Sequence, residues 1–135
     1  MISARVSATA QFYDLDPMQV VWHGHYPRFL EQARSALLDS IAFNYREMAQ
    51  TRFVWPVVDM RIKYVRPIRL AQEIEIEATL VEYENRLKID YEIRDRARGE
   101  VLTRAHTIQV AVDATTGELE FAMPSVLVDA VRRRL

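Results

Sequence analysis

A single stretch of this sequence has the spacing of a long helix, and nearly everything after it alternates as strands do. The spacing predicts a helix from His25 to about Phe43. Its apolar side chains fall on one stripe, made up of Phe29, Leu30, Ala33, Leu37 and Ile41. Pro27 suits the first turn, where its missing N–H costs nothing. A helix of about 17 residues is about 25 Å long, which is enough to cross one face of a sheet.

Alternating apolar and polar side chains predict the strands. The expected strands are Ala4–Phe12, Val57–Val65, Glu73–Tyr83, Leu87–Ile93 and Val101–Asp113. Such alternation is typical of an antiparallel sheet with one face in water. Two further helices are expected, a short one at Asn44–Gln50 and a closing one at Pro124–Arg134.

One long amphipathic helix and an antiparallel sheet pack as two layers, which places the fold in the α+β class. The 135 residues are near the commonest domain size, and no linker or internal repeat divides them. We therefore expect one domain over residues 1–135. A single helix covers only one face of a curled sheet and leaves the sheet edges open, which predicts a homodimer.

Composition excludes several classes of protein. The net charge of −1 leaves no broad basic surface for nucleic acid, and the absence of cysteine excludes disulfides and thiolate metal sites. The only glycines are Gly24, Gly99 and Gly117. The sequence therefore contains neither a glycine-rich nucleotide-binding loop nor the Gly-x-Ser-x-Gly turn of the α/β-hydrolases. No apolar run is long enough for a membrane span, and we expect a soluble, cytoplasmic protein.

The densest cluster of reactive side chains lies just before the long helix. Two carboxylates and two imidazoles stand within twelve residues, namely Asp14, Asp16, His23 and His25. The start of a helix presents unpaired N–H groups with a partial positive charge, which suits a developing oxyanion. A carboxylate nearby can act as a nucleophile or as a base for water. Together these parts predict acyl transfer or hydrolysis, with Asp14 as a turn former and no metal ligand set.

These residues resemble a known family. The pattern Asp16-x6-His23-x2-Tyr26 and the later Ile62-Lys63-Tyr64-x2-Pro67-x-Arg69 resemble the hotdog-fold acyl-CoA thioesterases of the 4-hydroxybenzoyl-CoA and tol-pal-associated types. The resemblance implies one curled antiparallel sheet of about five strands wrapped around one long helix. It also implies hydrolysis of an acyl-CoA thioester without a cofactor, at a site that lies across a dimer interface, with tetramers in many members.

The resemblance further assigns the site residues. Asp16 matches the catalytic carboxylate, and His23 matches a second catalytic position whose N–H, or that of Gly24, polarises the carbonyl. The expected substrate-binding residues are Gly24, Tyr26, Arg61, Lys63 and Arg66. The three basic residues are assigned to the CoA phosphates, which guanidinium groups bind well. The family binds these phosphates at varied positions, and for Arg61 and Lys63 the sequence favours a solvated strand face over phosphate binding.

Two other functions stay open from the sequence. The first is a thioesterase that acts on acyl groups attached to a carrier protein. The second is a non-catalytic module that binds acyl thioesters. This second reading is favoured by Pro17-Met18-Gln19, which stand where the family usually has small residues. Their bulk is expected to narrow the acyl pocket.

Overall fold

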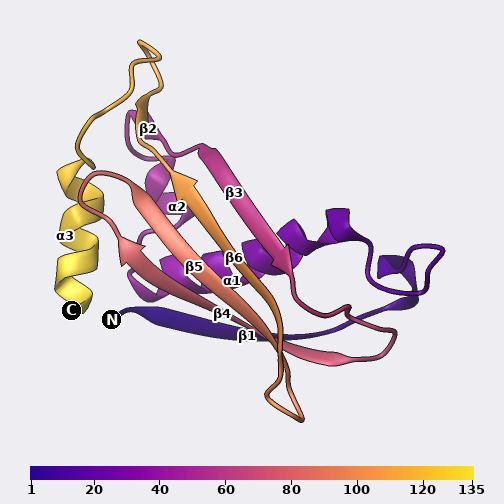
Figure 1. Ribbon diagram of the computed structural model, residues 1–135. Helices are drawn as coiled ribbons and strands as arrows, with labels where there is room; N and C mark the ends of the chain where they lie inside the picture. Colours follow the sequence, from indigo (N-terminus) through magenta and orange to yellow (C-terminus); the bar gives the residue numbers. More distant parts are fainter.

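Five antiparallel strands curl around one long helix in the computed structural model, which describes residues 1–135 (Figure 1). The helices are α1 (Tyr26–Ser40), α2 (Tyr45–Met48) and α3 (Ser125–Arg134), with 3-10 turns η1 (Phe12–Asp14) and η2 (His23–His25). The strands are β1 (Ser3–Thr9), β2 (Phe53–Val54), β3 (Val57–Tyr64), β4 (Glu73–Glu82), β5 (Leu87–Asp95), β6 (Val101–Gln109) and β7 (Val112–Asp113). The large sheet has the order β1-β4-β5-β6-β3, and β2 pairs with β7 separately. This confirms the expected α+β architecture.

The helix α1 and the inner face of the sheet form the core. The predicted apolar stripe is buried, from Phe29 to Leu37, and continues to Ile41 beyond the end of the helix. On the sheet, Ile76 pairs with Ile93 in register, and both are fully buried. Burying each such side chain stabilises the fold by roughly 1.5–3 kcal/mol, so the helix is held mainly by its contacts with the sheet.

The helix α1 ends at Ser40, earlier than the predicted Phe43. The reason is a Schellman motif built on an alanine. Ala42 has a left-handed φ of 56°, the N–H of Phe43 donates to Leu38 O, and the N–H of Ala42 donates to Asp39 O. Leu38 and Phe43 are both buried, which is the apolar contact that accompanies this motif. Because no glycine marks the end of this helix in the sequence, the predicted helix extended beyond its true end.

Two predicted strands are also shorter than expected. The chain leaves β1 at Thr9, and Phe12 lies in η1 with its side chain 76% exposed. The predicted strand Val101–Asp113 breaks after Gln109, because the N–H of Val110 donates to Pro56 O and the chain then pairs with β2 as β7. The predicted helix Asn44–Gln50 is present in shortened form as α2, and the predicted closing helix is present as α3.

Strand β3 is an exposed edge of the sheet. It pairs with β6 on one side only, and none of its eight residues is buried. Met60 and Tyr64 pair with Thr107 and Thr103 and therefore face α1, yet they are 36% and 45% exposed. The alternation of this strand was predicted correctly, but its exposure on the inner face was not.

Helix α3 closes one end of the core. Leu127 and Val131 are buried, and Arg134 Nε donates to Ser40 O at 3.2 Å, which ties α3 to the end of α1. Figure 1 shows α3 beside the turn between β4 and β5, at the opposite end of the molecule from the loop that precedes α1. None of the helices is long and apolar enough to cross a membrane.

Candidate active site

Asp16 lies in a tight loop between η1 and η2. The loop is closed by pairing of Leu15 with Val21, and the N–H of Asp16 donates to Val20 O at 2.9 Å. The carboxylate is half-buried, and its Oδ1 accepts a hydrogen bond of 2.8 Å from the N–H of Met18. This bond orients the side chain and leaves Oδ2 without a protein partner.

The bulky residues that replace the family's small ones change the surface of this loop rather than its closure. Met18 is 74% exposed, so its side chain points away from the core. Gln19 has a φ of 65°, in the left-handed region that favours glycine. The turn therefore keeps a glycine-like conformation with a glutamine in place.

The start of the long helix carries no side-chain cap. Trp22 precedes η2 and His25 precedes α1, and neither side chain accepts a hydrogen bond from the helix. The first intrahelical bond in η2 runs from the N–H of His25 to Trp22 O, so the amides of His23 and Gly24 precede it. The family resemblance assigned one of these two amides, that of His23 or that of Gly24, to the oxyanion.

The indole of Trp22 covers Gly24. A Cβ built on Gly24 would lie 2.5 Å from two ring carbons of Trp22, so only glycine fits beneath the indole as it stands. The same ring packs against the imidazoles of His23 and His25, with centroids 5.3 Å away in both cases. The side chain of Trp22 is 45% exposed over the helix start.

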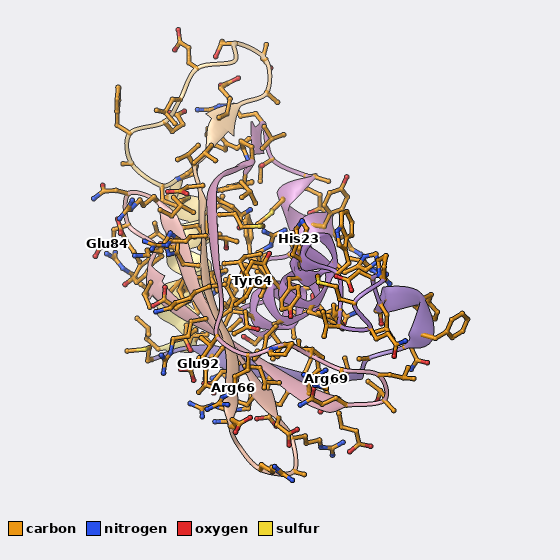
Figure 2. All side chains as sticks on the ribbon, turned by 45° about the vertical axis from the view of Figure 1, so that its right-hand side comes forward. His23, Tyr64, Arg66, Arg69, Glu84 and Glu92 are labelled. Atoms are coloured by element: carbon orange, nitrogen blue, oxygen red, sulfur yellow. The ribbon has the colours of Figure 1, made fainter.

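Tyr26 and Tyr64 form the wall between this helix start and the edge strand. Their rings pack edge to face with centroids 4.6 Å apart, and Tyr64 Oη donates to His23 O at 2.8 Å. Figure 2 shows Tyr64 of β3 next to His23. Burial raises the pKa of Tyr26 to about 12, the N–H of Ile68 opposes this shift, and the nearby Tyr64 and Asp16 add to it. Asp16, Tyr26 and Tyr64 therefore share one electrostatic neighbourhood.

Asp14 has a structural place, as predicted. It is buried, and its Oδ2 accepts a 2.8 Å hydrogen bond from the N–H of Gln11. Arg28 lies 3.8 Å from its Oδ1. No group of three or more histidine and carboxylate side chains is arranged to hold a metal ion.

The basic candidates divide between two places. Arg61 and Lys63 pair with His106 and Arg104 on the outer face of the sheet, away from α1 and Tyr64. Arg66 follows β3 in the loop and lines a shallow hollow with Arg69, near Glu100 at 3.7 Å (Figure 2). The structure therefore separates Arg61 and Lys63 from Asp16, whereas Gly24, Tyr26 and His23 are gathered at the helix start.

Comparison with known proteins identifies the family of this chain. The family described as the thioesterase-like superfamily matches residues 10–131. This chain belongs to the thioesterase-like superfamily. Among thioesterase-like relatives, YbgC of Escherichia coli, an acyl-CoA thioester hydrolase, is 26% identical over 102 residues, which are 76% of each chain. The Synechocystis protein sll0410, which carries an esterase name, is 32% identical over 109 residues, or 80% of this chain and 66% of that one.

Solved structures of thioesterases share the fold. The DHNA-CoA thioesterase of Staphylococcus aureus superposes with a TM-score of 0.85 at 23% identity, over 98% of this chain and 91% of that chain. The 1,4-dihydroxy-2-naphthoyl-CoA thioesterase Slr0204 of Synechocystis gives a TM-score of 0.85 at 19% identity, over 96% of both chains. The hotdog fold and the thioesterase family expected from Asp16-x6-His23 are confirmed.

Sequence reasoning missed the position of Tyr64 and the covering of Gly24 by Trp22 in this candidate site. Alternation already placed Tyr64 on the same side as Met60 and Ile62, so a signal for it was present. Nothing in the sequence marked Trp22 as the lid over Gly24, because that contact depends on the 3-10 turn that brings the ring back over the chain.

Proposed function

We propose that this protein hydrolyses an acyl-CoA thioester to a free acid and a thiol, with Asp16 as the catalytic carboxylate. The observation that carries the proposal is the uncapped start of the long helix, directly after the loop that holds Asp16. Amides in that position can stabilise an oxyanion by donating hydrogen bonds to it. The similarity to YbgC supports acyl-CoA as the substrate.

Asp16 can act as a general base. It takes a proton from water while the water oxygen bonds to the carbonyl carbon of the thioester. The carbonyl oxygen becomes an oxyanion, which accepts hydrogen bonds from the amides of His23 and Gly24. Collapse of this intermediate breaks the C–S bond, and the proton held by Asp16 passes to the leaving thiolate.

Asp16 can also act as a nucleophile. Its Oδ2, which no protein group engages, bonds to the carbonyl carbon, and the C–S bond breaks to leave a mixed anhydride that water hydrolyses. Both routes use the same oxyanion site. In either route the exposed imidazole of His23 orients the substrate or the water at the mouth of the site.

We further propose a homodimer formed through the free edge of β3. An edge strand presents unpaired N–H and C=O groups, and a two-fold axis pairs it antiparallel with its copy. With the axis at Arg61, Met60 lies opposite the partner subunit's Ile62, and the bulge at Val57 lies beside the partner subunit's Tyr64. Since Tyr64 contacts Tyr26 and His23, each active site then borders the β3 start of the other subunit.

The CoA phosphates are assigned to the loop after β3. Arg66 and Arg69 line one hollow there, and Arg66 is 61% exposed at its side chain. Both guanidinium groups can bind an anion, although Glu100 lies 3.7 Å from Arg66 in the same hollow. Arg61 and Lys63 reach phosphates only if the CoA bends over the sheet edge to the outer face.

The test is release of free thiol from a panel of acyl-CoA thioesters and matched carrier-protein thioesters. Asp16→Asn should lower kcat by at least about a hundredfold, because it removes the base or nucleophile and keeps the shape. Asp129→Asn, an exposed carboxylate on α3, is the matched control and should keep the wild-type rate. Full activity in a folded Asp16→Asn protein would overturn the assignment of Asp16 as the catalytic carboxylate. Faster hydrolysis of the carrier-protein thioesters would identify these thioesters, rather than acyl-CoA, as the substrate.

A further inference from the structure

The hydroxyl of Tyr64 ties strand β3 to the backbone at the start of the long helix. Tyr64 Oη donates to His23 O at 2.8 Å, although the two residues are 41 apart in the chain (Figure 2). Burial raises the pKa of Tyr64, so this hydroxyl stays protonated and can donate at neutral pH. The side chain of an edge strand therefore holds one particular carbonyl of the helix start.

This hydrogen bond takes the place of one that an α-helix would make. In an α-helix each carbonyl accepts from the N–H four residues further on, which for His23 is position 27. Pro27 has no N–H, so the carbonyl of His23 lacks its α-helical donor. A carbonyl oxygen has two lone pairs, and the hydroxyl of Tyr64 engages this one from another element of the fold.

The peptide group that Tyr64 holds also carries the amide of Gly24. The carbonyl of His23 and the N–H of Gly24 belong to one planar unit, in which they point in opposite directions. A hydrogen bond to the carbonyl therefore fixes the direction of the N–H. It also polarises the peptide group, which makes the N–H a better donor. Since the indole of Trp22 packs against Gly24, two side chains hold this peptide group in place.

The ring of Tyr64 is itself held by a buried neighbour. It packs edge to face on Tyr26, with centroids 4.6 Å apart, and Tyr26 is only 2% exposed. The backbone of Tyr64 pairs with Thr103 on β6. The hydroxyl is thus presented from a fixed ring and a fixed strand, as a precise hydrogen-bond donor requires.

In the proposed dimer, Tyr64 lies next to a cavity of the partner subunit. The cavity has a volume of about 560 Å³, is formed by α1, α2, β2 and the end of β6, and is lined by Trp55 and Gln109 among others. This volume is in the range of small-molecule sites. Gln109 pairs with Val57 at the start of β3, which in the dimer lies beside the partner subunit's Tyr64. An acyl group at one helix start would thus extend past Tyr64 into the cavity of the other subunit.

We propose that Tyr64 is a positioning residue, whose hydroxyl holds the His23–Gly24 peptide group so that the N–H of Gly24 points at the developing oxyanion. The inference rests on the proposed function and adds to it the group that orients the oxyanion donor. Negative charge collects on the carbonyl oxygen of the substrate only in the transition state, so a well-aimed N–H stabilises that state more than the bound substrate. Loss of the hydroxyl should therefore lower kcat and leave KM nearly unchanged.

The test is Tyr64→Phe, which removes the hydroxyl and keeps the ring on Tyr26. With the acyl-CoA thioester that the wild type hydrolyses fastest, kcat should fall about tenfold, less than for loss of a whole oxyanion donor, because the N–H of Gly24 remains. Tyr83→Phe, the same change at a half-buried tyrosine in the turn between β4 and β5, should keep the wild-type kcat and KM.

The pH dependence separates positioning from proton transfer. A hydroxyl that only holds a peptide group gives no proton to the substrate, so the pH profile of kcat should keep its midpoints in Tyr64→Phe. Loss of the alkaline limb of the profile in Tyr64→Phe would make Tyr64 a general acid and overturn the inference.

A further measurement needs no substrate. Loss of the hydrogen bond in Tyr64→Phe should shift the carbonyl resonance of His23 and the amide resonance of Gly24, whereas Tyr83→Phe should leave both in place. Unmoved resonances, or a wild-type kcat in folded Tyr64→Phe, would overturn the inference while leaving thioester hydrolysis intact. Absence of hydrolysis by the wild type with every thioester would instead remove the proposed function, and the resonances would still decide whether Tyr64 holds this peptide group.

Discussion

At the scale of single residues, Gly24 is where the smallest change should have the largest effect. Gly24→Ala places a methyl group against the indole of Trp22, so the ring or the helix start must move. A displacement of about 1 Å at an oxyanion donor can cost a hundredfold in rate, and we expect kcat/KM to fall at least tenfold. Thiol release measured on a folded Gly24→Ala protein checks this.

The control is a double-mutant cycle with Trp22→Ala. Removing the indole makes room for the added methyl group, so Trp22→Ala/Gly24→Ala should be more active than Gly24→Ala alone. If the two losses simply multiply, the clash between Trp22 and Gly24 is not the cause of the defect.

The sequence revealed those residues whose role depends on neighbours in the chain. Asp16, His23 and Gly24 could be picked out because they stand together before a recognisable helix. The place of Gln109 beside the cavity could not be predicted, because its amide is held by the carbonyl of Trp55, 54 residues earlier in the chain. A lone glutamine in a strand carries no sign of such a partner.

At the scale of elements, alternation predicted the strands of the sheet but not which strand lies at the edge. Strand β6 is paired on both sides, whereas β3 is paired on one. The edge position follows from the order of pairing, to which every strand contributes. The exposed Met60 and Tyr64 therefore became interpretable only once the sheet was assembled.

The exposed edge predicts the effect of a charge near the proposed axis. Met60→Asp puts two carboxylates close together across the two-fold axis, where like charges oppose pairing of the strands. We expect a shift from dimer to monomer in sedimentation, with loss of thiol release in parallel. Val126→Asp, the same type of change on the exposed side of α3, should leave both unchanged. An active monomeric Met60→Asp protein would rule out a shared site.

At the scale of the whole molecule, the proposed active site and the cavity lined by Gln109 lie at opposite ends of β3. Tyr64, at the end of β3, contacts the helix start, and Val57, at its beginning, pairs with Gln109 beside the cavity. Helix α3 lies at the end remote from the Asp16 loop (Figure 1). In one subunit alone, the proposed catalytic end and the cavity lined by Gln109 therefore do not meet.

In the proposed dimer the cavity of one subunit borders the Asp16 loop of the other, so two inactive variants should complement each other. Asp16→Asn damages only the catalytic end, and Ser35→Trp fills only the cavity, which Ser35 lines. In a dimer with one copy of each variant, one site carries both substitutions and the other site carries neither. Random pairing after co-expression should thus restore about a quarter of the wild-type sites, measured as thiol release. If the co-expressed variants release no more thiol than either variant alone, each active site uses the Asp16 and the cavity of the same subunit.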